Sequence, residues 1–528
     1  MSRSSKAFAW GTSLTPEQRM LVVDQAILLI EGFYVHLPLK RAMYAVDPLQ
    51  RLRLLRHRLP DIKDDRDFHQ EMMDIFTAVR DQHTIYYLPA FANTAAALPF
   101  SVEAFVENGT RKYIVSKFKN RFNPPKPSFC QGVEIMSWNA VPIARAVLTS
   151  AAQTPGANSE ARHALGLARL TQRALSVMPP PDEQWVHVGY KTADGGHDEV
   201  RIDWEIITEL PDDHRASAAS RSLSLETHSL RRIRKFQFAR PAGKGVLVSR
   251  MPDHLKAEKL GKFAYIRIYS FDVDKPGALV SEFIRLLKLL PQNGLIVDVR
   301  GNGGGRIWAG ERLIQLLTGA RPIEPERLYF INTPLTFRLC ELQKANPSLG
   351  PKGAKPWLES IRRSAETGAT YSASFHYTDP KACNKEKSYP GPVLVITDAL
   401  CYSATEFFAA GFQDHGGMIL GVDRATGGGG ANVRDHTDLL EYLNGAPDSP
   451  LRRLPKNKVG MRVALRRSVR VGRELGNEVE DFGVVPNCLH DMTCSDLLNN
   501  NEDLKRHATE LLADLARTRS QRSRKSRE

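Results

Sequence analysis

Ser403 stands where a hydroxyl could do chemistry. It follows an apolar run at 393–397 that is typical of a strand, and it opens a helix-like run at 404–413. Ser403-x-x-Glu406 has the spacing of a capping box, so the hydroxyl could simply cap the helix. The same position has the next backbone amide and the positive end of the helix dipole beside it, and both would stabilise the oxyanion formed by attack on a carbonyl. The segment alone leaves both interpretations open.

A glycine-rich run at 301–305 is the second segment that could take part in catalysis or ligand binding. It follows a predicted strand at 295–299 and precedes a predicted helix at 308–317, as a dinucleotide-binding loop would. The G-x-G-x-x-G spacing counted from Gly301 fails, however, because Arg306 stands where the last glycine is needed, and no G-K-[ST] follows. Consecutive glycines also expose backbone N–H groups without obstruction by a Cβ atom, which is what an oxyanion hole needs.

A nucleophilic hydroxyl needs a base to take its proton. His415 is the nearest histidine along the chain, but twelve helical residues at about 1.5 Å each place it roughly 18 Å from Ser403. His436 lies beyond the glycines at 427–430 and stays a candidate. An N-terminal histidine, His83, lies in Asp81-Gln82-His83-Thr84; taken alone, this segment is typical of an exposed histidine after a helix end.

The N-terminal part of the chain is predicted to be helical. Thr15-Pro16-Glu17-Gln18 has the capping-box pattern with proline at the first helical position, and apolar residues then recur at helical spacing until about residue 80. A strand is predicted at 85–88. Residues 100–205 change to strand-like runs, with a hairpin pattern around Asp194-Gly195-Gly196, and therefore indicate a small β-rich module that contains one helical segment at 158–177.

From Phe263 onward, strand and helix patterns alternate, which predicts an α/β core. A stretch at 211–230 that is rich in Ser, Ala, Asp and His reads as a linker, and the Arg/Ser-rich end after Ala516 is expected to be disordered. The predicted organisation is, in chain order, a helical region at 1–95, the β-rich module with its helical insertion at 100–207, a linker or mobile segment at 211–258, the α/β core at 259–500, and a final helix with a basic disordered tail at 501–528.

The composition is that of a globular protein, with 42% hydrophobic and 25% charged residues. The net charge of +14 arises from 73 Lys+Arg against 59 Asp+Glu, and part of it is concentrated at the basic C-terminal end. Six cysteines without a C-x-x-C pair predict neither a metal site nor a disulfide framework. The N-terminal segment has no apolar signal-peptide core and no stretch approaches 18 apolar residues, so we expect a cytoplasmic protein without a transmembrane segment.

Three separated motifs together resemble the tail-specific, or C-terminal processing, serine protease family. They are LIVDVRGNGGG at 295–305, VLVITDALCYSATEFFAAGFQDHG at 393–416 and GNEVEDFGVVPN at 476–487, where Asn487 replaces the usual Asp. QGVEIMSWNAVPIARAV at 131–147 is similar to the PDZ-type module that this family carries. The resemblance implies an α/β fold with a crotonase-like catalytic core, an N-terminal helical domain and a PDZ-like module.

The resemblance also implies roles for individual residues. It places the nucleophile at Ser403 and the oxyanion hole at the amides of Ala404 and of Gly303 or Gly304. The Gly-Lys-Gly turn that supplies a lysine base in bacterial processing proteases reads Thr-Gly-Gly-Gly-Gly at 426–430, so a Ser-Lys dyad is excluded by residue type.

The tricorn and chlamydial-protease-like branch uses instead a histidine in a D-x-H-T segment, which matches His83. A glutamate of the closing segment orients that histidine, which matches Glu480, with Glu474 and Glu478 as fallback choices. A serine peptidase acting on polypeptides through a Ser403–His83–Glu480 triad is therefore expected, with no metal or organic cofactor.

Two other classes of function remain open. One is a catalytically inactive protein that binds a peptide or ligand on the same scaffold, since fold resemblance does not establish chemistry. The other, a nucleic-acid or anionic-surface binder, rests only on charge and on the basic tail, and no specific nucleic-acid partner is expected. The sequence leaves the oligomeric state and the cleavage specificity undetermined.

Overall fold

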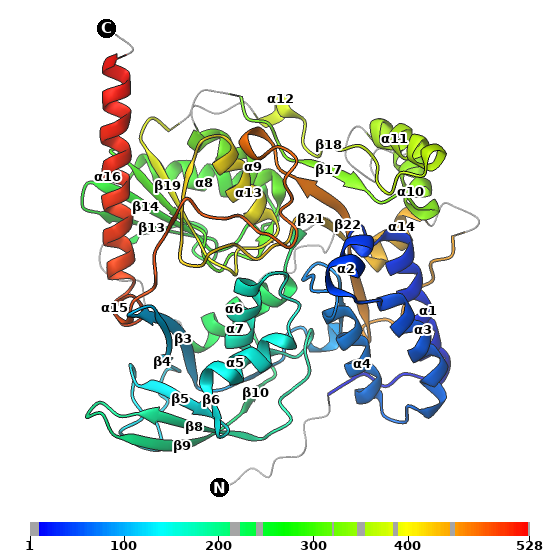
Figure 1. Ribbon diagram of the computed structural model, residues 1–528, viewed down its shortest axis with the longest axis horizontal. Coiled ribbons are helices and arrows are strands. Elements are labelled where there is room, and N and C mark those ends of the chain that lie inside the picture. The colour runs from blue at the N-terminus through cyan, green and yellow to red at the C-terminus, as the bar shows by residue number, and fades with distance from the viewer. Residues whose placement is uncertain are drawn as a thin grey trace.

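The computed structural model describes residues 10–211, 222–238, 246–318, 322–345, 354–383, 389–443 and 449–525, which form a mixed α/β fold (Figure 1). Its largest sheet has the strand order β12-β13-β14-β15-β19-β20-β23, and the pairs from β14 to β23 are parallel. The strands are β12 Val246–Leu247, β13 Leu255–Leu260, β14 Phe263–Ile268, β15 Leu295–Asp298, β19 Val393–Thr397, β20 Met418–Gly421 and β23 Cys488–Leu489.

The central strands β15 and β19 are buried along their whole length because helices cover both faces of the sheet. On one face, Leu295, Val297 and Val395 share a core with helices α8, α9 and α13. On the other face, Ile296 and Leu394 pack against α16. These helices span Pro276–Lys288 (α8), Ile307–Thr318 (α9), Ala404–Asp414 (α13) and Glu502–Lys525 (α16).

Helix α16 lies in the region for which the sequence predicted a final helix with a basic disordered tail. It continues through the Arg/Ser-rich stretch to Lys525 and extends away from the body of the molecule (Figure 1). Its first half is anchored by Leu504, Ala508 and Leu512 against the sheet. An i,i+3 ion pair between Arg517 and Asp514 supports the exposed part.

The N-terminal helices pack onto a second sheet rather than onto the parallel one. That sheet has the order β1-β22-β17-β18, and β21 also pairs with β22. Buried residues of the helices share one core with its strands, for example Phe33 and Phe68 with Val463 and Leu465. The elements are α1 Pro16–Phe33, α2 Leu37–Tyr44, α3 Pro48–Arg58, η1 Leu59–Asp61, α4 Asp65–Thr77, β1 Ile85–Tyr87, β17 Arg327–Phe330, α10 Pro334–Ala345, α11 Ala354–Thr367, β18 Phe375–His376, α12 Pro380–Cys383, β21 Ala431–Asp435, α14 His436–Leu443 and β22 Gly460–Val469.

The β-rich module forms a separate sheet with its own core. Its strand order is β3-β4-β5-β8-β9, with β6 paired to β5, and the predicted hairpin is formed by β8 and β9. Trp138, Val147 and Val188 belong to this core. The elements are β3 Phe100–Glu107, β4 Thr110–Phe118, β5 Glu134–Trp138, β6 Val141–Pro142, α5 Ile143–Ala152, α6 Ser159–Arg169, β8 Trp185–Lys191 and β9 His197–Asp203.

The expected linker at 211–258 contains regular structure instead. Residues 212–221 and 239–245 lie outside the described part, but helix α7 spans Leu225–Phe238 and buries Leu230 and Ile233. These two residues sit four and seven positions after Glu226, so one helix face is apolar enough to pack although the segment looks polar overall. The remaining short elements are η2 Pro89–Phe91, β2 Ala95–Ala97, β7 Gln172–Ala174, β10 Glu205–Ile207, β11 Ser222–Leu223, β16 Gly304–Gly305, η4 Gly472–Glu474 and α15 Cys494–Leu498.

Within the described residues, no single helix is long and apolar enough to span a membrane. Helices α1 and α2 pass the length and composition test only as a pair, and they meet at 95°.

Candidate active site

Ser403 lies at the sharp turn between strand β19 and helix α13. Its backbone adopts φ 60° and ψ −123°, a conformation that non-glycine residues rarely occupy and that costs free energy unless the surroundings enforce it. The preceding amide, of Tyr402, donates to the carbonyl oxygen of Asn302 at 3.1 Å. The strained turn is thereby tied to the glycine-rich run that follows β15.

His83 reaches Ser403 from the N-terminal part of the chain. Its Nε2 lies 2.7 Å from Oγ of Ser403, and both side chains are fully buried. The rings of His83 and Tyr402 are 4.7 Å apart between centroids, so the residue before the nucleophile packs against the imidazole. Two residues that are 320 positions apart are thus hydrogen-bonded in the interior.

The Asp-x-His-Thr segment explains how the chain presents His83. Asp81 Oδ1 accepts the backbone N–H of His83 at 2.7 Å, and Asp81 Oδ2 accepts the hydroxyl of Thr84 at 2.8 Å, which closes a tight turn after α4. The hydroxyl oxygen of Thr84 also accepts the N–H of Ala464 in β22 at 3.1 Å. Strand β1 then pairs with β22, with Ile85 opposite Arg462, so the turn is fixed to a sheet.

Burial keeps the imidazole of His83 neutral. Desolvation is the largest cause that lowers its pKa well below the usual value, and the charges of Arg462 and Lys40 lower the pKa further. A neutral imidazole can accept the proton of a hydroxyl at neutral pH. The electrostatics of the site therefore suit a general base.

The backbone amides beside Ser403 are arranged as a candidate oxyanion hole. Ala404 is the first residue of α13, and Gly303 lies in the run tied to Tyr402; in the described residues neither N–H has a hydrogen-bond acceptor. The N–H of Gly304, by contrast, donates to Oδ1 of Asn302 at 3.0 Å. Of the two glycines considered from the sequence, Gly303 has the free donor.

Glu480 lies near this pair but is bonded to other groups. Its Oε1 is 2.8 Å from Nζ of Lys40, and its Oε2 accepts the N–H of Gly430 at 3.1 Å and lies 3.4 Å from Nε2 of His36. Burial raises the pKa of Glu480 well above its usual range, whereas the charge of Lys40 lowers it. No hydrogen bond or ion pair joins Glu480 to His83 among the described residues.

The second ring nitrogen of His83, Nδ1, is left without a hydrogen-bond partner. The carboxylate oxygen closest to it among the recorded ion pairs is Oδ1 of Asp81, at 4.0 Å, which is too long for a hydrogen bond. The structure therefore brings Ser403 and His83 together. Glu480, which was predicted to orient His83, makes no hydrogen bond to the imidazole.

The other sequence candidates lie elsewhere. His415 caps the end of α13 and accepts the N–H of Glu324 at 2.9 Å, and His436 is 3.0 Å from Oε1 of Gln25. Glu478 pairs with Arg467, and Glu474 is exposed. None of these four candidates is hydrogen-bonded to Ser403 or to His83.

Lys40 and His36 are site residues that sequence analysis missed. Lys40 is completely buried and contacts the carboxylates of Glu480 and Asp481, while neither ring nitrogen of His36 makes a hydrogen bond and its Nε2 only approaches Glu480. The sequence around them is an ordinary helix pattern with no chemical signal. His36, Asp81 and Glu480 offer ligand atoms within 4.8 Å of one another, but the ammonium of Lys40 already supplies the positive charge that a metal ion would bring.

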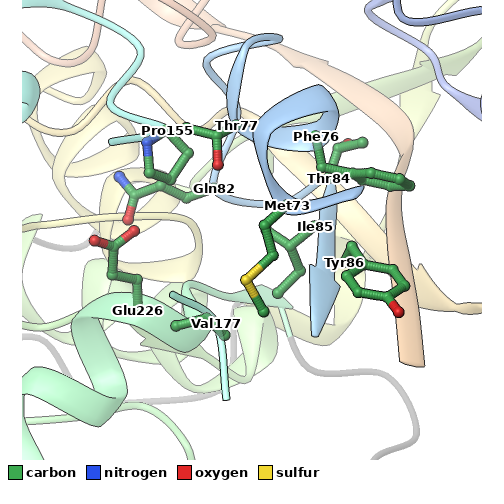
Figure 2. A pocket seen from close by; sticks show the side chains of 10 residues that line it. All are labelled: Met73, Phe76, Thr77, Gln82, Thr84, Ile85, Tyr86, Pro155, Val177 and Glu226. Atoms are coloured by element: carbon green, nitrogen blue, oxygen red, sulfur yellow. The ribbon is translucent and has the colours of Figure 1, made fainter. Parts of the chain in front are cut away.

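A pocket lies beside the residues that flank His83 (Figure 2). Gln82 and Thr84 line it together with apolar side chains from α4, among them Met73 and Phe76, and with the buried carboxyl of Glu226. Oε1 of Gln82 accepts the hydroxyl of Ser224 at 2.6 Å. Because the backbone amide of Ser224 donates to the carbonyl oxygen of Gly303, this network connects the base segment with the oxyanion loop.

Comparisons with known proteins identify two family regions and the fold. Residues 262–441 match the model of peptidase family S41, and residues 94–215 match a PDZ domain. The structure of mature CPAF aligns with a TM-score of 0.68 at 16% identity, covering 96% of this chain and 99% of that one. A CPAF mutant aligns with a TM-score of 0.69 at 16% identity, covering 96% and 98% of the two chains.

A search of curated proteins by sequence finds no match. From the family and structure comparisons, the chain carries a region that matches peptidase family S41 and a region that matches a PDZ domain, and it has the fold of CPAF. This confirms the predicted tail-specific protease resemblance, the α/β fold class and the PDZ-like module.

The turn that presents His83 can be tested through Thr84. Thr84→Val removes the hydroxyl that bonds Asp81 and leaves the buried N–H of Ala464 without an acceptor, so we expect the free energy of unfolding to fall by about 1–3 kcal/mol. Thr84→Ser keeps both hydrogen bonds and serves as the control. Urea unfolding of the two variants should show a clear difference; equal midpoints would contradict the role assigned to this hydroxyl.

Proposed function

We propose that this chain is a serine peptidase in which Ser403 is the nucleophile and His83 the general base. The observation that carries the proposal is the 2.7 Å hydrogen bond between Nε2 of His83 and Oγ of Ser403, within a region that matches peptidase family S41. Ser403 attacks the scissile carbonyl carbon while His83 takes the hydroxyl proton. The negative charge that forms on the carbonyl oxygen is stabilised by the free amides of Ala404 and Gly303.

The reaction then follows the two halves of acyl transfer. The protonated imidazole of His83 gives its proton to the leaving amine, and an acyl-enzyme forms on Ser403. Water attacks the acyl carbon while His83 takes a proton from it; the second tetrahedral intermediate then collapses, the bond to Oγ of Ser403 breaks, His83 returns the proton to that oxygen, and the carboxylate product leaves. Because Ser403 and His83 have no exposed surface, substrate must displace covering chain before it reaches them.

We further propose that Glu480 is the acid that orients His83. The oxygens of Asp81 already accept the backbone N–H of His83 and the hydroxyl of Thr84, and they are held 4.0 Å from Nδ1. Glu480 belongs to the closing segment, and its longer side chain can rotate from Lys40 toward the unpartnered Nδ1. Such a move would satisfy one buried nitrogen and stabilise the imidazolium.

The substrate class is a polypeptide, and an internal or a C-terminal bond could be the target. The match of residues 94–215 to a PDZ domain supports capture of an extended peptide by strand addition. Internally quenched peptides with free and with amidated C-termini distinguish the two modes, since an endopeptidase cleaves both equally.

The nucleophile is tested first. A fluorophosphonate should label the wild-type chain, and Ser403→Ala should remove both labelling and peptide hydrolysis. Mass spectrometry of the labelled peptide locates the adduct. Labelling that persists in Ser403→Ala would exclude this serine, and a wild-type chain that neither reacts nor hydrolyses peptides would be a binding protein on a peptidase scaffold.

The base is tested by matched histidine variants. His83→Ala should lower kcat by several orders of magnitude, because the members of such a site act as a unit. His415→Ala should stay within about twofold of wild type, since this ring bonds only the chain around α13 and residue 324. Steady-state kinetics measures kcat for both variants. A large loss of kcat in His415→Ala together with full activity in His83→Ala would reject His83 as the general base.

The acid is tested by Glu480→Gln against Asp81→Asn. Loss of the carboxylate that stabilises imidazolium should lower kcat by about 10²–10⁴-fold in Glu480→Gln with little change in KM. Asp81→Asn retains an oxygen acceptor for the turn and should lose less than about tenfold. The reverse order would assign the acid to Asp81, and Glu474→Gln at an exposed position is the control.

The pH profile gives an independent readout for Glu480. Activity rises with pH as His83 loses its proton, and the charge of Lys40 already lowers the pKa of His83. Removing the anion of Glu480 leaves that charge less compensated, so the pKa falls further and the acid limb of kcat/KM should move to lower pH. An unchanged limb in Glu480→Gln would contradict its proximity to the imidazole.

A further inference from the structure

The glycine turn, residues 427–430, has every backbone N–H donor engaged. The N–H of Gly427 donates to the carbonyl oxygen of Cys401 at 2.9 Å. Those of Gly428 and Gly429 donate to the two carboxylate oxygens of Glu406, at 2.8 and 2.6 Å. The next N–H, of Gly430, donates to Glu480 as described above. Three successive amides are therefore divided between two buried carboxylates.

The turn requires glycine for steric reasons. A Cβ atom on Gly427 would lie 2.6 Å from the ring of Tyr402, and one on Gly429 only 2.0 Å from it. A Cβ atom on Gly430 would lie 2.7 Å from the backbone nitrogen of Glu480, and Gly428 has φ +78°. The absence of side chains lets the turn approach Tyr402, the residue before the nucleophile.

Glu406 is the centre of this arrangement. Besides the two glycine amides, its carboxylate accepts the backbone N–H of Ser403 at 3.2 Å and the hydroxyl of Thr426. The hydroxyl of Thr426 in turn accepts the N–H of Val484 at 2.7 Å, in the segment that carries Glu480. One side chain thus joins the nucleophile turn, the glycine turn and the closing segment.

All four groups that hydrogen-bond to the side chain of Glu406 are donors, so they fit its ionised carboxylate better than its protonated carboxyl. Three of its four contacts are backbone N–H groups, which cannot accept a proton, and the fourth is the hydroxyl of Thr426. The largest effects on its pKa come from burial and from these four hydrogen bonds; Cys401 and Tyr402 are titratable groups that sense its charge, and burial raises their pKa values. Burial raises the pKa of Glu406 to about 7, although the hydrogen bonds lower it.

We infer that Glu406 is a positioning residue whose carboxylate holds Ser403 and the glycine turn in register, and through Gly430 sets the place of Glu480. The glycine turn acts here as an amide clamp for two carboxylates. Glu406 does not touch the substrate, and the inference rests on the proposed peptidase function. It implies that the site is assembled only while Glu406 is ionised, which adds a second proton-dependent step to that of His83.

The test compares Glu406→Gln with Glu311→Gln. Glu311, in α9, is also buried and has a pKa raised to about 7 by burial, but among the described residues no hydrogen bond or ion pair joins it to the three segments that Glu406 connects. An amide at position 406 places an NH2 group against N–H donors, so we expect kcat to fall about 10²-fold in Glu406→Gln with little change in KM. Glu311→Gln should stay within about twofold of wild type.

The pH profile separates positioning from a merely structural role. In wild type, log kcat/KM should rise with a slope approaching 2 at the acid side, because both Glu406 and His83 must lose a proton. In Glu406→Gln the slope should fall to 1 and the ionisation near pH 7 should disappear. A wild-type profile with a single ionisation overturns the inference, and this measurement stands even where Glu406→Gln does not fold.

Hydrogen exchange tests the clamp without relying on activity. Amides of residues 427–430 should lose protection in Glu406→Gln and keep it in Glu311→Gln. Unchanged protection would overturn the inference. Lost protection together with an unchanged two-proton slope would also overturn it, because Glu406 would then support the fold alone. A wild-type chain without peptidase activity would refute the proposed function, while the exchange result would still report on the clamp.

Discussion

The hydrogen bond between His83 and Ser403 is the contact on which the site depends, and most of the architecture around it serves to hold its two ends. Ser403 is fixed by a strained turn at the end of a parallel strand, and His83 by a turn attached to a different sheet. Strand β22 connects the turn that carries His83 with the glycine turn, because it pairs with β1 after His83 and with β21 after the glycine turn. Arg462 of β22 stands opposite Ile85 on one side and Asp435 on the other. The turn that carries His83 and the glycine turn are therefore both attached to strand β22.

Burial sets the charge states in this interior. Without solvent, an imidazole is easier to keep neutral and a carboxylate harder to keep ionised, so the same environment that makes His83 a base requires compensation for Glu480. Lys40 supplies that compensation as a buried ammonium, and backbone amides supply it for Glu406. The two solutions differ in consequence. Lys40 binds Glu480 through a charged side chain, whereas Glu406 is held by three backbone N–H groups and one hydroxyl.

Much of the fold was predictable because it follows from local pattern. The fully buried strands β15 and β19 are continuous apolar runs, and Thr15 and Pro16 begin α1 with the capping box expected. The pairing of His83 with Ser403 was accessible only through resemblance, since no spacing rule connects residues so far apart. The capping-box spacing indicated one donor to Glu406, the N–H of Ser403, but Lys40 and the other three donors around Glu406 gave no sequence signal, because buried charges are defined by what tertiary contacts place around them. Helix α7 was read as part of a linker because its polar composition hid a narrow apolar stripe.

The distribution of the site along the chain has a consequence for biosynthesis. The base segment is made first, the oxyanion loop and nucleophile follow, and Glu480 and strand β23 come close to the end. Strand β22, which anchors the base, spans Gly460–Val469, so the histidine has no fixed position until most of the polypeptide has left the ribosome. Long-range pairing of this kind also forms slowly. A nascent chain therefore carries Ser403 and His83 without the strand that fixes the histidine, and the two side chains are brought together only after β22 has been synthesised.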